Sequence, residues 1–235
     1  MKKTVFVVEG QTERIFVEKF IEELAGALAY SVTSVEHHGD SLVHVHSRGN
    51  APEDRADYVI NIIDVGNDDK VRSYVGDENI ELFIKKGFQG VYGLRDKYTG
   101  NGKEISLALN SEIDFELTKK WGVSVEVVVA VQEVEAWFLS VPRFFTAYNN
   151  SLIIRRLNEI LGYDISTIPV EAISHPSEEI NKVLKTVGKK YKKKERDAFK
   201  ITHNLDYDVL YAERSAVIPA LGRLCALIDS SLVSP

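Results

Sequence analysis

Val5-Phe6-Val7-Val8-Glu9-Gly10-Gln11-Thr12 is the stretch that decides the fold. Its first four residues are β-branched or aromatic, which is typical of a strand buried on both faces of a parallel sheet. Gly10 interrupts this pattern, and Thr12 is a residue type that caps helices. Apolar residues then recur at helical spacing through about Ala29. The chain is therefore predicted to begin with a buried strand followed by a helix.

The same alternation continues along the first half of the chain. Strands are predicted at residues 58–63, 89–94 and 124–131, and helices at 71–84, with a break at Gly76-Asp77, and at 105–120. Residues 31–57 contain two short strand-like stretches around a His-rich turn. Alternation of this kind, with fully apolar strands, predicts an α/β fold in which helices cover both faces of a parallel sheet.

The character of the sequence changes after Pro142. The remaining residues are mostly helical in pattern, at 153–161, 177–191 and 209–232, with turn-rich segments between them. We therefore place a domain boundary here. Residues 1–141 are predicted to form the α/β domain, and residues 142–235 a mainly helical region packed on it.

Composition excludes several classes of protein. The 235 residues carry 29 Lys and Arg against 35 Asp and Glu, a net charge of −6, which excludes a histone-like basic nucleic-acid binder. Cys225 is the only cysteine, so neither an internal disulfide nor a Cys-rich zinc module can form. No apolar segment is long enough to span a membrane, and no export signal is recognised. We expect a cytoplasmic protein with no membrane partner.

Carboxylates follow every predicted strand of the first half. They are Glu9, Asp64, Asp96 and the pair Glu133 and Glu135. Because ligands of an open parallel sheet bind outside the carboxyl ends of its strands, this cluster predicts a site for a divalent metal such as Mg²⁺ or Mn²⁺. Asp64 precedes a predicted helix start and is interpreted as a helix-capping residue. Glu9 and Asp96 are interpreted as functional.

The strongest basic segment is residues 189–200. It holds seven positive and two negative side chains, a local charge of +5. Such a run can follow a phosphate backbone, so Lys190, Lys192 and Lys193 are candidate substrate-binding residues, and Tyr191 or Phe199 could stack on a base. The alternative is a solvated helix end, where lysine is favoured.

Other candidate sites receive less support. His44 and His46 would share one face of a strand and could bind zinc, but no cysteine accompanies them, and a surface hairpin with incidental histidines is the preferred interpretation. The sequence holds no Gly-x-Ser-x-Gly motif and no phosphate-binding loop of the required spacing. Acyl transfer and P-loop nucleotide binding therefore have no support.

The segment from Val7 to Glu13 resembles the opening motif of Toprim domains, in which a Glu followed by Gly ends the first strand. In that fold an Asp-x-Asp motif ends the third strand, and Asp96-Lys97-Tyr98 stands at that place here. The chain is more closely similar to an uncharacterised bacterial Toprim-like family, the domain of unknown function 4276, related to overcoming-lysogenization-defect (OLD) nucleases. Glu133-Val134-Glu135-Ala136 and Tyr191-Lys192-Lys193 resemble its Glu-x-Glu-Ala and Tyr-x-Lys elements.

The resemblance implies a metal-dependent phosphodiester site. Glu9 would be a metal ligand or general acid and base, Asp96 the principal ligand, and Glu133 and Glu135 completing ligands. Tyr98 stands in place of the second Asp, and a neutral phenol is a poor ligand for a hard cation, so one ligand is lost unless Glu133 or Glu135 replaces it.

Three residues around Asp96 complete the set of candidate site residues. Arg95, Lys97 and Tyr98 surround Asp96 in sequence and are assigned to substrate binding, with a structural anchor as the alternative for Arg95. The expected function is a Mg²⁺- or Mn²⁺-dependent nuclease acting on DNA or RNA, with defence against phage or mobile DNA as one biological role to test. Formation of a homodimer and action with a partner ATPase are left open.

Two other functions remain as alternatives. One is a binding or assembly module that keeps the fold without turnover, for which Tyr98 is the main support. The other is a phosphohydrolase for a small nucleotide, which the negative net charge favours over a long polymer substrate.

Overall fold

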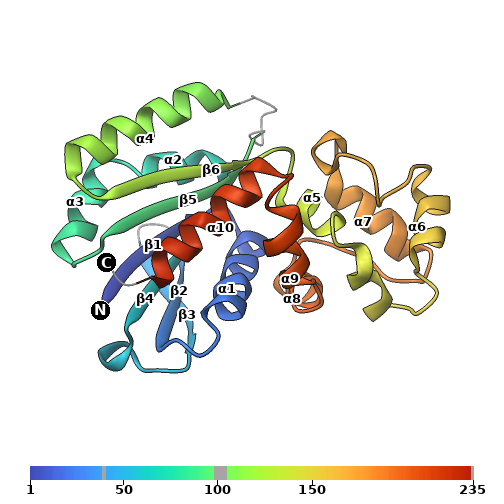
Figure 1. The fold of residues 1–235 in the computed structure, drawn as a ribbon, viewed down its shortest axis with the longest axis horizontal. Helices are drawn as coiled ribbons and strands as arrows, with labels where there is room; N and C mark the ends of the chain where they lie inside the picture. The colour runs from blue at the N-terminus through green and yellow to red at the C-terminus, as the bar shows by residue number, and fades with distance from the viewer. Residues whose placement is uncertain (39–40, 98–104, 234–235) are drawn as a thin grey trace.

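The centre of the protein is a twisted, mostly parallel sheet. The structure, a computed structural model, describes residues 1–38, 41–97 and 105–233. Within these residues six strands lie in the order β3-β2-β4-β1-β5-β6 (Figure 1). They are β1 (Lys2–Val8), β2 (Tyr30–His38), β3 (Ser41–Gly49), β4 (Tyr58–Asp64), β5 (Gly90–Asp96) and β6 (Ser124–Ala130). Only β3 is antiparallel; it pairs with β2 at the edge.

Helices cover both faces of this sheet, which confirms the predicted α/β fold. Helices α1 (Gln11–Ala25) and α10 (Pro219–Leu232) lie on one face (Figure 1). The opposite face carries α2 (Asp68–Tyr74), α3 (Asp77–Lys85) and α4 (Leu107–Trp121). The predicted break at Gly76-Asp77 is confirmed, because α3 begins immediately after Gly76.

Strand β1 is buried on both sides, as its sequence predicts. Phe6 and Val8 pack into the core beneath α1, whereas Val5 and Val7 pack into the core beneath α2 and α3. At its carboxyl end Val8 lies in register with Asp64 of β4 and Leu94 of β5. The residues that follow β1, β4 and β5 are therefore brought to one edge of the sheet.

The C-terminal region is helical. Helix α5 (Val134–Leu139) leads into it, and its own helices are α6 (Ile154–Leu161), α7 (Pro176–Lys185), α8 (Glu195–Thr202), the short α9 (Tyr207–Val209) and α10. Short turns of other helical types are η1 (Glu53–Arg55), η2 (Pro142–Ala147), η3 (Val170–Ala172) and the π-helical η4 (Leu210–Arg214). One hydrophobic cluster runs from the sheet face into these helices. A boundary at residue 142 stays a prediction.

Several predicted helix ends were wrong. The first helix ends at Ala25 rather than Ala29, because Gly26 adopts a φ of 52° and closes it. The predicted helix over 177–191 ends at Lys185, and the one over 209–232 is divided before Pro219, the first residue of α10. The predicted helix cap at Thr12 was also wrong, since Gly10 is the N-cap of α1.

No single described helix is long and apolar enough to cross a membrane. Tyr207–Arg214 and Pro219–Leu232 pass such a test together, but the pair is bent by 111°. The apolar residues of α10 are buried in the core of the protein.

A buried arginine ties the start of α1 to neighbouring elements. The Arg14 side chain is 0% exposed, and its guanidinium lies 3.1 Å from Glu18, 3.3 Å from Glu36 and 3.4 Å from Glu195. These partners come from α1, β2 and α8 respectively. Arg14 therefore fixes the first turn of α1 against the sheet and the C-terminal region.

Arg14→Met is expected to lower the free energy of unfolding by about 3 kcal/mol, because it removes the buried cation 3.1 Å from Glu18 and leaves that carboxylate with only His46 and the more distant Arg48. The loss lies at the lower end for a buried pair, since Glu36 and Glu195 are partly exposed. Urea denaturation would measure it, with Arg155→Met as the control at a side chain that is 87% exposed. Equal stability of the two variants would contradict the structural role of Arg14.

Candidate functional site

Glu9 and Asp96 meet at the carboxyl edge of the sheet, as the strand-end pattern predicts. Strands β1 and β5 are parallel neighbours, so Glu9 directly after β1 lies beside Asp96 at the end of β5. The backbone N–H of Asp96 donates a hydrogen bond to Glu9 Oε2 at 3.0 Å. Strand β6 pairs with β5 and leads into α5 (Figure 1), which brings Glu133 and Glu135 to the same edge.

These residues surround a cleft of about 510 Å³. Its lining includes Glu9, Asp96 and Glu133 together with Glu13 and Lys193. Glu135 lies beneath, with a fully buried side chain, and interacts electrostatically with Asp96. The strand-end carboxylates other than Asp64 are therefore grouped around one cleft.

Asp64 does not line this cleft. Its Oδ1 accepts a hydrogen bond from the backbone N–H of Gly66 at 2.9 Å, and its Oδ2 lies 3.9 Å from the Arg14 guanidinium. These contacts stabilise the turn between β4 and α2. They agree with the assignment of Asp64 outside the functional site, although it stabilises a turn and not the start of a helix.

Glu13 is a site residue to which the sequence analysis gave no role. It lies in the first turn of α1, is 6% exposed and faces Glu135 and Glu9. Burial and these two carboxylates raise its pKa to about 8. The signal was present in the sequence, because a helix that begins directly after Glu9 turns the residue four positions later back towards the strand end.

Asp96 lies where the negative charge is most concentrated. Burial raises its pKa well above the usual range, and Glu13, Glu9 and Glu135 raise it further. Its Oδ1 is buried with no hydrogen-bond partner among the described residues, and the same is true of Glu135 Oε2. Buried carboxylate oxygens without partners are costly unless a proton or a cation satisfies them.

Lys193 supplies the positive charge within the cluster. Its Nζ lies 2.7 Å from Glu133 Oε1 and 3.5 Å from Glu135 Oε1. Although burial opposes it, Glu135 and Glu133 raise the pKa of Lys193, which keeps the ammonium charged. Burial would raise the pKa of Glu133, but Lys193 and Ser177 outweigh it and lower that pKa, so Glu133 is ionised.

The backbone is unusual at two places in this site. Lys193 has a φ of 51° and Gln132, directly before Glu133, has a φ of 67°. In the described part of the chain these are the only non-glycine residues with positive φ. Such conformations cost free energy and concentrate at functional sites. Both of them position side chains that contact the carboxylate cluster.

Tyr191 supports the cluster from within the protein. Its hydroxyl donates to Glu135 Oε1 at 2.7 Å and lies 3.4 Å from Thr12 Oγ1. Because Tyr191 is only 5% exposed, the prediction that its ring stacks on a base was wrong. Thr12 serves this hydrogen-bond network instead of capping α1.

The other candidate substrate-binding residues are dispersed. Lys190 and Lys192 are exposed and do not line the cleft. Arg95 is 5% exposed and, as the strand neighbour of Asp96, points to the opposite face of the sheet. Lys97 is half-buried and interacts electrostatically with Glu171. Tyr98 lies outside the described residues.

The carboxylates of the cleft fit a magnesium or manganese ion only if water and substrate phosphate supply the rest of its coordination shell. In the described ranges no group of three or more His, Cys, Asp or Glu side chains is arranged to hold a metal ion by itself. Mg²⁺ commonly takes one or two carboxylates and completes its shell with water and substrate phosphate. Asp96, with its unpartnered Oδ1, and the adjacent Glu9 and Glu13 fit this mode.

The histidine-rich segment forms a hairpin, as predicted. His44 Nε2 lies 3.0 Å from Ser47 Oγ, and His46 Nε2 lies 3.0 Å from Glu18 Oε2. The two rings thus contact different partners on β3 and α1. This arrangement agrees with the preference for a hairpin over a zinc site.

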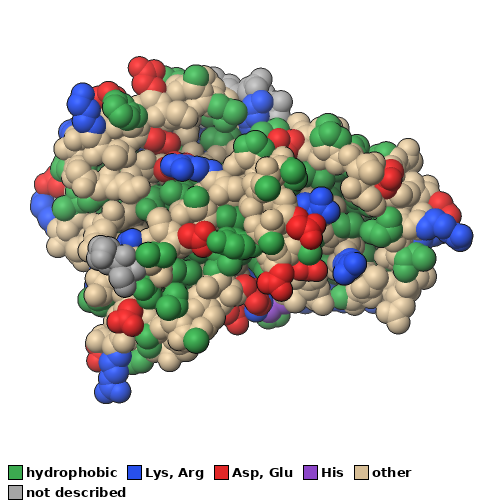
Figure 2. Space-filling view, viewed as in Figure 1, with side chains coloured by type: hydrophobic (Ala, Val, Ile, Leu, Met, Phe, Trp, Pro, Cys, Tyr) green, Lys and Arg blue, Asp and Glu red, His purple; other side chains and the backbone are tan. Residues whose placement is uncertain are grey.

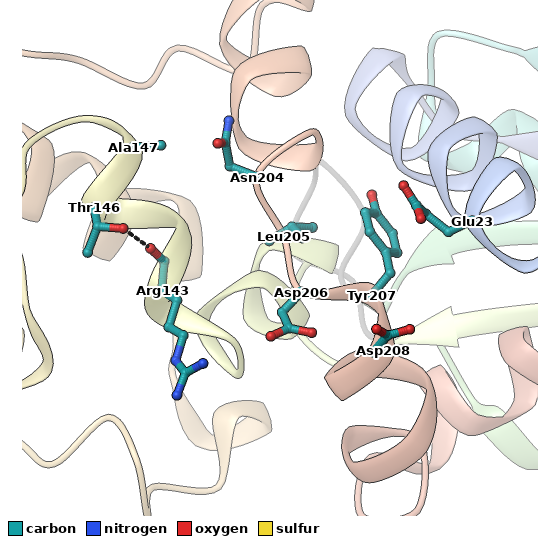
Figure 3. A pocket seen from close by; sticks show the side chains of 9 residues that line it. All are labelled: Glu23, Arg143, Thr146, Ala147, Asn204, Leu205, Asp206, Tyr207 and Asp208. Atoms are coloured by element: carbon teal, nitrogen blue, oxygen red, sulfur yellow. Dashed lines mark hydrogen bonds between the residues drawn. The ribbon is translucent and has the colours of Figure 1, made fainter.

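A second hollow lies away from the strand ends. Its volume is about 470 Å³, and Figure 3 shows Glu23, Tyr207 and the carboxylates of Asp206 and Asp208 around it. Arg143 is the one basic residue in its lining. Because none of the strand-end carboxylates reaches it, this hollow is separate from the carboxylate cleft.

A comparison with protein families identifies the family to which the chain belongs. Residues 8–217 match the family described as Domain of unknown function (DUF4276). The chain belongs to this family. The matched range contains every residue of the carboxylate cleft.

The comparisons with solved structures and with curated proteins give no further information about function. A solved structure, the hypothetical protein PH0156 from Pyrococcus horikoshii OT3, is similar at 14% identity and a TM-score of 0.47, over 99% of this chain and 100% of that one. No curated protein matches the sequence.

Proposed function

We propose that this DUF4276 protein is a divalent-metal-dependent nuclease that hydrolyses phosphodiester bonds of DNA or RNA, with Mg²⁺ or Mn²⁺ as its cofactor. The observation that carries the proposal is the unpartnered, buried Oδ1 of Asp96 beside Glu9 and Glu13 at a solvent-open cleft. Such a group of carboxylates is stable in the ionised form only when cations offset it.

A Toprim-like relationship is part of this proposal. Glu9-Gly10 follows the first strand of the sheet, and Asp96 ends the parallel strand next to it. Glu133 and Glu135 follow the strand after that. These positions support the relationship to Toprim domains and OLD nucleases that the motifs suggest.

The residues have distinct roles in the proposed mechanism. Asp96 would hold the metal together with Glu9 or Glu13, and the metal would supply polarisation of a phosphoryl oxygen and a lowered pKa of water. The other of these two glutamates would accept or return a proton beside the reacting phosphate. Lys193, held by Glu133 and Glu135, faces Asp96 and would neutralise charge on the phosphate.

Lys190 and Lys192 are exposed beside Lys193 in sequence and would contact the flanking phosphates. A homodimer, a partner ATPase, a cytoplasmic location and a role in phage defence stay predictions.

One observation favours the small-nucleotide alternative. Acidic and basic side chains are scattered over the face in Figure 2, and no extended basic stripe crosses it. With a net charge of −6, long-polymer binding would depend on local contacts such as the lysines after Tyr191. A small nucleotide needs fewer phosphate contacts.

A cleavage assay tests the proposal. Labelled single- and double-stranded DNA and RNA are expected to be cut in Mg²⁺ or Mn²⁺ and to stay intact with a chelator, because Asp96 and its neighbours need the cation to engage phosphate. Metal-dependent hydrolysis of nucleotides without polymer cleavage would favour the phosphohydrolase. Metal-independent binding without any hydrolysis would favour the binding module and contradict the nuclease.

A further inference from the structure

A further pocket lies at the other end of α5 from the carboxylate cleft and has a different chemistry. Its volume is about 310 Å³, and it lies between residues 165–171 and the turn that follows η4. Apolar side chains, among them Ile168, Pro169 and Ile218, form much of its wall. Polar and apolar surface contribute about equally to this wall, which suits a small organic group that has polar edges and apolar faces.

Arg214 gives this pocket a donor in need of an acceptor. It lines the pocket, and its guanidinium forms no hydrogen bond or ion pair with the described residues. The Nε itself is shielded, so the terminal nitrogens are the donors that a ligand would reach. Arg214 is the last residue of the π-helical turn η4, a type of turn that is frequent at functional sites. The segment after it packs tightly on α10, because a Cβ at Gly222 would lie 2.4 Å from the Ser215 carbonyl oxygen.

Glu171 supplies an acceptor in the same pocket. It lies in η3 and is half-buried, and no ion pair joins it to Arg214 among the described residues, although both line the pocket. A ligand carboxylate would be repelled by Glu171. The pair instead fits a flat group that offers an acceptor to the guanidinium and donors to the carboxylate.

The pocket lies one short helix away from the proposed phosphodiester site, because Glu133 of the cleft is the N-cap of α5 and Ser140 of the pocket is its C-cap. Burial raises the pKa of Glu171 and Lys97 opposes this shift, so Lys97 lies within electrostatic range of the pocket. Lys97 directly follows Asp96, and its backbone N–H donates to the Ala130 carbonyl at 2.8 Å. A nucleotide near Asp96 could therefore place its base, or a neighbouring base, in this pocket.

We propose that this pocket binds a guanine base. Guanine offers O6 and N7 as acceptors for an arginine, and its N1–H and N2–H₂ can both donate to one carboxylate. Ile168, Pro169 and Ile218 would contact the faces of the ring. The assignment deepens the proposed nuclease function, on which its relevance to cleavage rests, whereas base binding is measured without any cleavage.

The test is the affinity of the full chain for nucleosides in the absence of metal. Guanosine is expected to bind at least tenfold more tightly than 1-methylguanosine, which lacks the N1 donor, and than adenosine, which presents the reverse pattern. These comparisons use the unaltered protein and so do not depend on the folding of a variant. Equal affinity for guanosine and adenosine would overturn the proposal.

Variants locate the binding. Arg214→Met and Glu171→Gln are each expected to weaken guanosine binding at least tenfold, and Arg155→Met, at an exposed arginine, to leave it unchanged. Thermal melting identifies any variant that is unfolded. Unchanged binding by folded Arg214→Met overturns the site. Selective guanosine binding without nuclease activity would remove the proposed function alone, whereas cleavage without guanosine binding would remove this inference alone.

Discussion

Asp96→Asn is expected to reduce metal-dependent cleavage by about 1000-fold, equivalent to ~4 kcal/mol of transition-state stabilisation. Asparagine keeps the shape of the side chain, but it removes the negative charge that would hold the cation on the phosphate. The unpartnered Oδ1 of Asp96 is the group that the substitution makes neutral. Initial rates of cleavage in Mg²⁺ and Mn²⁺ would measure the loss.

The same substitution should not destabilise the protein. Because burial and neighbouring carboxylates raise the pKa of Asp96, ionising it costs free energy in the folded state at neutral pH. A neutral asparagine avoids that cost, so the melting temperature of metal-free Asp96→Asn is expected to equal or exceed that of the unaltered protein. Activity and stability thus change in opposite directions, which a purely structural residue would not produce.

Asp54→Asn is the matched control, since Asp54 is exposed in η1 and remote from the strand ends. It should cleave at the unaltered rate. Normal cleavage by Asp96→Asn would show that the assigned site is wrong. A joint loss of cleavage and stability would assign Asp96 a structural role instead.

The sequence predicted the position of this site because the rule behind it is local. Apolar runs mark buried parallel strands, and the residues after such strands meet at one edge of the sheet. Glu9 and Asp96 required nothing more than the order of the strands and their common direction. Their contact at 3.0 Å follows from β1 and β5 being neighbours, which alternation alone does not specify.

Lys193 and Tyr191 could not be placed in the same way. Their segment carries a run of lysines, for which contact with phosphates and a solvated helix end were the two interpretations. In the structure residues 189–194 are not helical, and Lys193 adopts a left-handed backbone that places its ammonium among the carboxylates. This conformation depends on the packing of α8 against α1, a contact between residues about 180 positions apart, as in the Thr12–Tyr191 pair.

Arg95 illustrates a further limit of sequence reasoning. Its position next to Asp96 suggested a shared role in substrate binding. Side chains of a strand alternate between the two faces, so neighbours in sequence lie on opposite sides of the sheet. This alternation separates Arg95 from Asp96 only if both residues belong to the strand. The structure shows that they do, because they are the last two residues of β5.

The charge state of Glu13 predicts how stability depends on pH. Its pKa is raised from 4.5 to about 8 in the folded protein, so the folded state binds a proton that the unfolded state releases at lower pH. The stabilisation is fully present below about pH 4.5 and is lost as the pH rises through about 8. Metal-free protein is therefore expected to lose stability across this range, which urea denaturation at several pH values would measure.

Glu13→Gln should remove much of this pH dependence, because glutamine is uncharged throughout.

A divalent metal should act against the trend in the unaltered protein, since it favours ionised Glu13 and its neighbours. The rise in melting temperature with Mn²⁺ is expected to increase as the pH approaches 8, and to be smaller and flatter in Glu13→Gln. Glu78→Gln, at an exposed residue of α3, is the control. A pH profile that is identical in Glu13→Gln and the unaltered protein would place the proton elsewhere in the cluster, and a Mn²⁺ effect that falls with rising pH would exclude the carboxylates as its ligands.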